Sequence, residues 1–355
     1  MSEPEVIARV EGGLGRLTLN RPAALHALTT NMCRLMIEAL LAWREDPSVE
    51  AVLIDHAGER GFCAGGDIRM LAESGAGDGA AARAFFFTEY RLNDLLFNYP
   101  RPVVAVMDGV TMGGGVGLSM PAKYRIATER TTFAMPETGI GLFPDVGGGW
   151  FLPRLRSHVG LWLALTGARL KAADCFALEI ATHVVPSARV GELKAAIAAK
   201  PGHIPEALAP FETDPGAAPI LAHLADIDRL FAAPNVEAIV ANLKADASDW
   251  AKAQLTTLAA KSPQTMKVAF RQLALGARKT LFADNMAMEY RIGARVVQRH
   301  DFIEGVRAVI VDKDNAPHWN PPDLEGVTEA DLDAIFAALP ADQEWTPLSP
   351  IVETR

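Results

Sequence analysis

Alternation of apolar and polar positions dominates the start of the chain. Residues 5–20 alternate around a Gly-Gly pair, which predicts a β-hairpin. Apolar residues then recur every three or four positions up to Trp43, and Thr29 precedes them as a residue that can cap a helix. The chain is therefore expected to begin with a hairpin followed by a helix.

Two continuous apolar runs follow, AVLID (51–55) and PVVAVMDG (102–109), and both indicate buried strands. Each is followed by a glycine loop and then by a helical pattern, which covers about 80–98 after the first run. Two shorter strands are expected within 124–135. Because strand, glycine loop and helix recur, the pattern predicts a mostly parallel α/β core with sites at the loops that follow the strands.

The pattern changes near residue 205. Residues 202–219 have the composition of a loop, and few strand signals follow them. Helical stretches are expected near 218–231, 248–260, 263–277, 281–299 and 302–311. The Pro-rich tail after 338 is expected to be irregular. We therefore predict two domains, 1–205 with the functional site and an α-helical 206–355.

Composition limits the class of protein. The chain has 355 residues, of which 50% are hydrophobic and 22% charged, as in ordinary globular proteins. A net charge of −9 argues against general nucleic-acid binding, and no apolar run reaches the roughly 18 residues of a membrane span. The three cysteines include no CxxC, and the first residues match neither a signal nor a transit peptide, which predicts a reduced, cytoplasmic protein.

Several common motifs are absent or out of context. The chain contains neither a GxxxxGK[ST] phosphate loop nor a GxSxG elbow, and no two of its eight histidines lie three or four residues apart. GAGDGA (75–80) matches a form of the dinucleotide fingerprint but does not follow a strand, so we interpret it as a flexible loop. No metal site is expected.

Two acids lie in one of the most apolar stretches, AMPETGIGLFPDVGGGW (134–150). Burying the carboxylates of Glu137 and Asp145 is costly unless they are paired or hydrogen-bonded, and burial raises a carboxyl pKa toward the range useful for acid–base catalysis. The alternative is that each acid caps a helix or binds neighbouring N–H groups. For Asp145, which precedes VGGGW, an N-cap role is a serious alternative.

A third acid and two glycine loops complete the candidate site. Glu89 falls on an apolar helical stripe, so it lies at a pocket edge or pairs with a cation such as Arg91 or Arg125. The loops CAGGD (63–67) and MGGGVG (112–117) follow the two buried strands. Glycines let backbone N–H groups approach a ligand, and two converging N–H groups would make an oxyanion hole. The alternative is that these glycines only permit tight turns.

Six stretches spread over nearly the whole chain resemble the enoyl-CoA hydratase/isomerase (crotonase) superfamily. They are LTLNRPAALHALT (17–29), GFCAGGDIRML (61–71), DGVTMGGGVGLSM (108–120), FAMPETGIGLFPDVGGGWFLPRL (133–155), LALTGARLKAADCFALEIATHVV (163–185) and MEYRIGARVVQRHDFIEGVRAVIVDKDNAPHW (288–319). The glycine loops are typical of the whole superfamily, whereas PETGIGLFPDVGGG and HDFIEGVRAVIVDKD are typical of its hydrolase branch. The resemblance implies an α/β fold, a crotonase-like spiral of ββα repeats followed by an α-helical C-terminal part.

The resemblance also implies an activity and its residues. It implies a thioester hydrolase that converts 3-hydroxyisobutyryl-CoA to 3-hydroxyisobutyrate and coenzyme A, a step of valine degradation. The thioester carbonyl would accept hydrogen bonds from the N–H groups of Gly66 and Gly114. The implied substrate-binding residues are Glu89, Gly114, Glu137 and Asp145, and the implied coenzyme A-binding residues are Ala64, Gly65, Asp67 and Ile68.

In the implied mechanism Glu137 and Asp145 are the catalytic residues. Glu137 attacks the thioester as a nucleophile, the favoured route, or activates a water, and Asp145 orients the water, the substrate hydroxyl or the leaving thiol. Hydratases of the superfamily carry a second catalytic Glu where this chain has Gly117, which argues against the main alternative, an enoyl-CoA hydratase or isomerase. A third alternative, a coenzyme A-binding protein without catalysis, gives little reason for two buried acids.

The implied partner is a small acyl-CoA substrate, and neither a nucleic acid nor a membrane is expected. No cofactor is expected, because coenzyme A arrives as part of the substrate. A homo-oligomer stays open, since members of the superfamily often form trimers.

Overall fold

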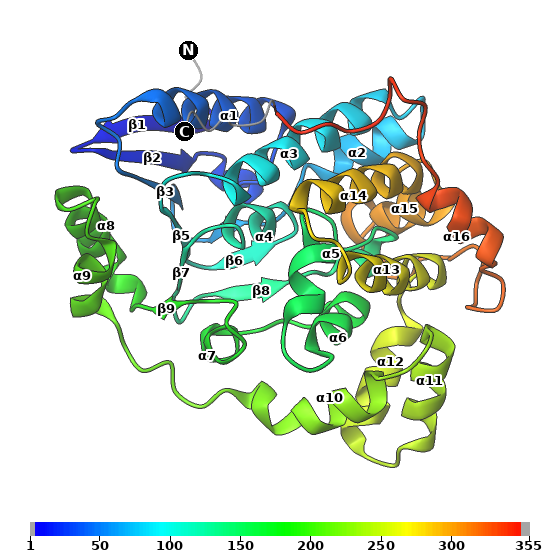
Figure 1. Ribbon diagram of the computed structural model, residues 1–355. Coiled ribbons are helices and arrows are strands. Elements are labelled where there is room, and N and C mark those ends of the chain that lie inside the picture. The colour runs from blue at the N-terminus through cyan, green and yellow to red at the C-terminus, as the bar shows by residue number, and fades with distance from the viewer. Residues whose placement is uncertain (1–3, 349–355) are drawn as a thin grey trace.

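The computed structural model describes residues 4–348, which form an α/β core with helices around it (Figure 1). The predicted hairpin is confirmed as β1 (Val6–Glu11) and β2 (Leu14–Leu19), which pair antiparallel. The predicted helix is α1 (Thr30–Glu45), and the side chain of Thr29 accepts a hydrogen bond from the Met32 N–H at its start.

The remaining strands belong to two sheets. They are β3 (Ala51–His56), β4 (Gly61–Cys63), β5 (Val103–Met107), β6 (Val110–Met112), β7 (Tyr124–Ala127), β8 (Thr132–Ala134) and β9 (His183–Val184). The larger sheet has the order β1-β2-β3-β5-β7-β9 and is parallel from β2 onward, and the smaller one is parallel with the order β4-β6-β8. From β3 onward, successive strands alternate between the two sheets, as in a spiral of ββα repeats, and this confirms the expected fold class.

The predicted strands β3 and β5 are buried along their whole length because both faces of the sheet are covered. In β3, Val52 and Ile54 join the larger hydrophobic cluster, whereas Leu53 on the opposite face joins a smaller one. Helices α8 (Val190–Ala199) and α9 (Ile204–Leu208) cover the smaller cluster. The prediction of a loop over 202–219 is wrong at α9, where the apolar side chains needed to cover the sheet stabilise a short helix.

Helices of the first part of the chain follow the strands. They are α2 (Ile68–Gly75), α3 (Ala80–Phe97), α4 (Gly114–Ser119), α5 (Gly148–Phe151), α6 (Val159–Thr166) and α7 (Ala172–Ala177). The segment 75–80 is the turn between α2 and α3, and no strand precedes it. This segment therefore lacks the preceding strand that a dinucleotide-binding fingerprint requires.

Helices also make up most of the chain after residue 220. They are α10 (Leu224–Phe231), α11 (Val236–Ala245), α12 (Asp249–Ala259), α13 (Pro263–Gly276), α14 (Phe282–Val296), α15 (His300–Val306), a π-helical turn (Arg307–Val311) and α16 (Glu329–Phe336). The five predicted stretches are confirmed, whereas α11 and α16 were not predicted. Helix α14 packs along α3, and α13 packs against α5 (Figure 1). The division near residue 205 stays a prediction.

The search for membrane-crossing helices covers residues 4–348. None of the helices in this range combines the length and the apolar character that a crossing requires.

Candidate active site

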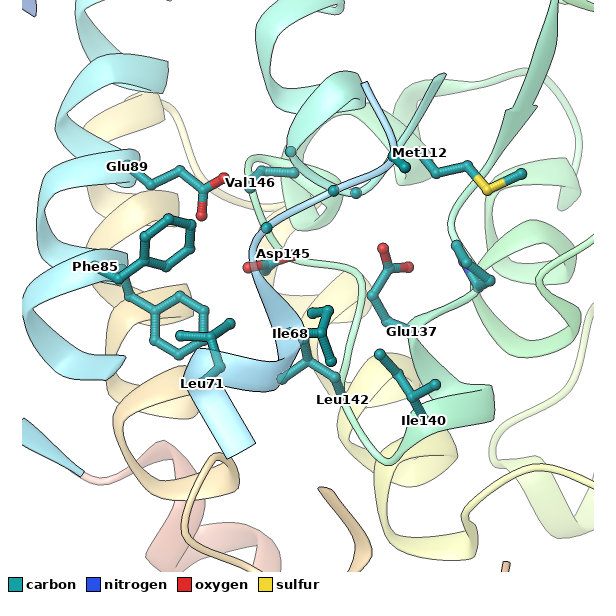
Figure 2. A pocket seen from close by; sticks show the side chains of 17 residues that line it. Ile68, Leu71, Phe85, Glu89, Met112, Glu137, Ile140, Leu142, Asp145 and Val146 are labelled. Atoms are coloured by element: carbon teal, nitrogen blue, oxygen red, sulfur yellow. The ribbon is translucent and has the colours of Figure 1, made fainter. Parts of the chain in front are cut away.

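A pocket lies where the loops that follow β4, β6 and β8 meet α3 (Figure 2). Its empty volume is about 470 Å³, part of which is open to solvent. The predicted site residues that line it are Ala64, Gly65, Gly66, Ile68, Glu89, Gly114, Glu137 and Asp145. The fold thus brings together segments that are far apart in the sequence, and Asp67 alone of the predicted set does not line this pocket.

The three acids come from three different elements. Glu89 lies on α3, Glu137 opens a short 3₁₀ helix (Glu137–Ile140) after β8, and Asp145 precedes α5. Their exposed fractions are only 2%, 5% and 5%, respectively. In Figure 2, Asp145 lies between the other two, with apolar side chains around them. The pocket is therefore a largely apolar space that holds three carboxyl groups.

Burial sets the protonation of these acids. It raises the pKa of Glu89 and Glu137 well above the ordinary value, and the charge of Asp145 raises both further. Burial also raises the pKa of Asp145, to about 7. A carboxyl group with a pKa of about 7, such as that of Asp145, can hold or release a proton near neutral pH, as acid–base catalysis requires.

The structure decides between the alternatives for Glu89. Arg91 donates to Thr346, and Arg125 donates to the carbonyl of Ile180, so both predicted cations have other partners. One carboxyl oxygen of Glu89 is buried without a hydrogen-bond partner among residues 4–348. Glu89 therefore lies at the pocket and does not pair with either arginine.

Asp145 is not a helix cap. The N-cap residue of α5 is Gly147, and the Asp145 backbone carbonyl, not its side chain, accepts from the Gly148 N–H. The carboxylate instead accepts a hydrogen bond of 2.9 Å from the hydroxyl of Tyr90, which is fully buried. A side chain held in this way faces the pocket rather than the helix.

The glycine loops approach the pocket closely. A Cβ atom at Gly114 would lie 2.7 Å from Oε1 of Glu89 and 2.8 Å from Cδ1 of Leu28, and one at Gly66 would lie 3.0 Å from the ring of Phe85. In the described part of the chain, neither the Gly66 nor the Gly114 N–H donates to a protein atom. Gly114 is also the first residue of α4, where helix N–H groups lack partners. Both N–H groups are therefore available to a ligand.

Turn geometry explains other glycines of the same loops. Gly65 and Gly113 have φ values of 118° and 47°, which side-chain-bearing residues rarely adopt. Glycine is therefore required at Gly65 and Gly113 by the turn. At Gly66 and Gly114 it is required because neighbouring side chains leave no space for a Cβ atom.

Two predicted positions have a different local structure. The side chain of Asp67 caps α2 by accepting from the Met70 N–H and lies 3.4 Å from Arg21, so its contact with coenzyme A stays a prediction. A Cβ atom at Gly117 would lie 2.6 Å from Val146 and 2.7 Å from Asn93. No second glutamate side chain could enter the site from position 117 without displacing these neighbours.

Sequence reasoning missed three charged or polar residues near the site. Tyr90 holds Asp145, the Lys261 charge lowers the pKa of Glu137 against the effect of burial, and Glu289 accepts from the loop that follows Asp145. Glu289 could have been found in the same way as Glu89, because it lies on the buried stripe of an amphipathic helix. Lys261 gives no such signal, since it lies in the turn before α13.

Residues 4–348 include no group of three or more His, Cys, Asp or Glu side chains arranged to hold a metal ion. The expectation of a reaction without a metal or redox cofactor stays a prediction.

Comparison with known proteins agrees with the fold. The model of the enoyl-CoA hydratase/isomerase family matches residues 14–336, and the chain belongs to this family. Among its relatives are proteins named "3-hydroxyisobutyryl-CoA hydrolase, mitochondrial". The one from Danio rerio is 47% identical, over 94% of this chain and 90% of that protein. The one from Homo sapiens is 44% identical, over 94% and 89%.

Solved structures support the same family. A carnitinyl-CoA dehydratase from Mycobacterium thermoresistibile has a TM-score of 0.92 and 42% identity, covering 97% of this chain and 99% of that one. An enoyl-CoA hydratase from Rhodobacter sphaeroides 2.4.1 has a TM-score of 0.89 and 39% identity, covering 97% and 100%. Both matches extend through the C-terminal helices.

The expectation of a cytoplasmic protein is contradicted by these names, because the relatives are named mitochondrial. The expectation depended on the first residues and on three cysteines, all of which are free and buried in the structure. Free cysteines indicate only a reducing environment, and more than one compartment of a cell is reducing.

Proposed function

We propose that the chain is an acyl-CoA thioester hydrolase that converts 3-hydroxyisobutyryl-CoA to 3-hydroxyisobutyrate and coenzyme A, a step of valine degradation. The observation that carries this proposal is one pocket lined both by Gly66 and Gly114, whose N–H groups have no partner among residues 4–348, and by three buried carboxyl groups. Such a pocket combines donors for a developing oxyanion with groups for nucleophilic or acid–base work. The names of the relatives supply the acyl group.

In this proposal the N–H groups of Gly66 and Gly114 bind the thioester oxygen and stabilise its charge in the transition state. Each such donor is typically worth about 2.7–4 kcal/mol of barrier. A Cβ at the neighbouring Gly113 would lie 3.3 Å from Oε1 of Glu137, so the carboxylate lies beside the loop that carries one donor. Glu137 is thus our candidate for the group that acts on the thioester carbon.

Two routes then lead to the products. In the favoured one, a Glu137 oxygen bonds to the carbonyl carbon, the carbon–sulfur bond breaks, and coenzyme A leaves as a thiolate that takes up a proton. Water next attacks the resulting anhydride and releases the acid and the Glu137 carboxylate. In the other route Glu137 removes a proton from water, which attacks the thioester directly. Asp145, with a pKa of about 7, can in its ionised form orient the attacking water or accept a hydrogen bond from the substrate hydroxyl, and the thiolate takes its proton from solvent.

The two similar solved structures are named a carnitinyl-CoA dehydratase and an enoyl-CoA hydratase, and hydration is therefore the main alternative to hydrolysis. Hydration of an enoyl-CoA in this superfamily uses a second Glu at the position of Gly117, where Val146 and Asn93 leave no space. The pocket has its further acids at Glu89 and Asp145 instead, which favours hydrolysis.

Release of free thiol from 3-hydroxyisobutyryl-CoA, followed with a thiol dye, tests the proposed function. We expect steady turnover of this substrate and no loss of absorbance from the conjugated thioester of crotonyl-CoA. Consumption of crotonyl-CoA without thiol release from 3-hydroxyisobutyryl-CoA would show that the chain is a hydratase. Binding of both substrates without turnover would leave only a coenzyme A-binding protein.

Tyr90→Phe is expected to shift the pH dependence of turnover upward. Burial raises the pKa of Asp145 and the Tyr90 hydroxyl, which stabilises the ionised form, lowers it, so that the resulting pKa is about 7. Without this hydrogen bond the pKa of Asp145 rises further, so less of the carboxylate is ionised at neutral pH. The acidic limb of kcat against pH then moves to higher pH.

Tyr99→Phe is the matched control for this experiment, because the Tyr99 hydroxyl donates to the Leu40 carbonyl and Tyr99 does not line the pocket. An unchanged acidic limb in Tyr90→Phe, with a normal one in the control, would mean that the ionisation of Asp145 does not govern the rate.

A further inference from the structure

The loop that carries Asp145 has an unfavourable backbone conformation. Val146 has a φ of 50°, in the left-handed region that β-branched residues rarely occupy. The following Gly147 has a φ of 94°. Such strain persists only where surrounding contacts determine the conformation, and it is often found at functional sites. The contacts that hold this loop therefore bear on the position of Asp145.

Glu289 supplies two of these contacts from α14. It is fully buried, its Oε2 accepts from the Gly147 N–H at 2.8 Å, and its Oε1 accepts from the Gly149 N–H at 2.9 Å. Both N–H groups belong to the start of α5, the short helix that directly follows Asp145 and Val146. A single carboxylate thus fixes the backbone immediately after the strained residue.

Two amide side chains hold Glu289 in turn. The Asn285 amide donates to Oε1 of Glu289 at 2.8 Å, and the Gln272 amide donates to the same oxygen at 3.0 Å. The Gln272 amide also donates to the carbonyl of Pro144, the residue before Asp145, at 2.7 Å. The loop is therefore tied down on both sides of Asp145 by residues of α13 and α14.

The start of α5 packs closely against the side chains of α13 and α14, so its backbone has little room to move. A Cβ atom at Gly149 would lie 2.7 Å from Oδ1 of Asn285 and 3.0 Å from Nε2 of Gln272. On its other side the Asp145 carboxylate is held by Tyr90 of α3, and α14 packs along α3. Contacts from both helices therefore converge on the same short loop.

We propose that Glu289 is a positioning residue for the reaction, which acts through the backbone of Gly147 and Gly149 to hold Asp145 in its catalytic orientation. The inference rests on the proposed function in so far as Asp145 acts on the substrate. It gives the C-terminal helices a part in catalysis, because Glu289, Asn285 and Gln272 all belong to them.

Glu289→Gln tests this inference. A Gln amide keeps the shape but presents an N–H₂ to one of the two backbone N–H groups, so one contact becomes a repulsion. We expect kcat to fall by roughly 10- to 100-fold, as for a small displacement of a catalytic group, with KM changed by less than about threefold.

Asp174→Asn is the control for loss of stability. Asp174 is also a buried carboxylate that accepts from a backbone N–H, that of Ile220, but it does not line the pocket. The Asp174→Asn substitution should lower Tm by about as much as Glu289→Gln does and leave kcat unchanged. A kcat in Glu289→Gln equal to wild type, or a similar loss of kcat in Asp174→Asn, would overturn the inference.

A double-mutant cycle with Asp145→Asn separates positioning from general damage. Asp145→Asn keeps Glu137 and both glycine donors, so a slow rate should persist. If Glu289 acts through Asp145, adding Glu289→Gln to Asp145→Asn lowers kcat little further, and the effects of the two substitutions on kcat are far from additive. The same fall in kcat in both backgrounds would overturn the inference.

If Glu289→Gln fails to fold, Asn285→Ala replaces it in the cycle, because this substitution removes one hydrogen-bond donor to Glu289.

The cycle is measured on whichever acyl-CoA the wild type turns over. Failure of the wild type to release thiol would therefore overturn the proposed function, whereas additive mutant effects would overturn only the role of Glu289.

Discussion

Replacement of Glu137 by Gln is expected to lower kcat for thiol release by at least about 10³-fold. A Gln side chain has nearly the same shape, but it can neither attack the thioester nor accept a proton from water. Oε2 of Glu137 is buried without a hydrogen-bond partner among the described residues, so the side chain contributes little to folding. We therefore expect the Tm of Glu137→Gln to equal or exceed that of the wild type.

Glu38→Gln is the matched control, because Glu38 is a largely exposed acid on α1, with only a distant contact to Arg34. It should keep the wild-type kcat and Tm. Thiol release by Glu137→Gln within a few-fold of the wild-type rate would remove Glu137 from both proposed routes. A fall in kcat together with a large fall in Tm would instead indicate a structural role.

Gly114→Ala is the second substitution with a large expected effect, a fall in kcat of roughly 10²- to 10³-fold. Its Cβ would lie 2.7 Å from Oε1 of Glu89 and 2.8 Å from Cδ1 of Leu28, so the backbone has to shift. The shift moves the N–H that we expect to stabilise the oxyanion. Because this donor acts mainly on the transition state, kcat should fall much more than KM rises.

Gly191→Ala provides the control, because a Cβ there meets no atom within 4 Å. It lies on α8, far along the chain from the pocket residues, and both kcat and Tm should be close to wild type or slightly improved. A normal kcat in Gly114→Ala would mean that the Gly114 N–H does not contact the reacting oxygen. A rise in KM alone would place its contribution in substrate binding.

Local pattern was sufficient for most elements of the fold. Thr29 and the apolar spacing after it predicted α1 with its cap, and the two apolar runs predicted β3 and β5. These signals are strong because burial on both faces of a strand, or on one face of a helix, leaves a fixed period in the sequence. Helices α11 and α16 were missed, although the spacing of Val236, Ile239 and Leu243 is helical.

The candidate site was predicted in part. Buried acids in apolar stretches drew attention to Glu89, Glu137 and Asp145, and the structure places all three in one pocket. The same rule applied to α14 would have found Glu289, but its partners, the N–H groups of Gly147 and Gly149, could not be inferred from local sequence. The hydrogen bond between Tyr90 and Asp145 likewise joins two elements that only the packing of the chain brings together.

By itself, the sequence determined most of the elements, the glycine loops and the types of group available for chemistry, because these depend on residues near one another in the chain. Only the tertiary structure decided which of these groups meet. It brought Gly66 and Gly114 into one pocket. It also made Asp67 the N-cap of α2 and packed Val146 and Asn93 against Gly117. The physical reason is that the direction and burial of a side chain depend on contacts between segments far apart in sequence, which no local period records.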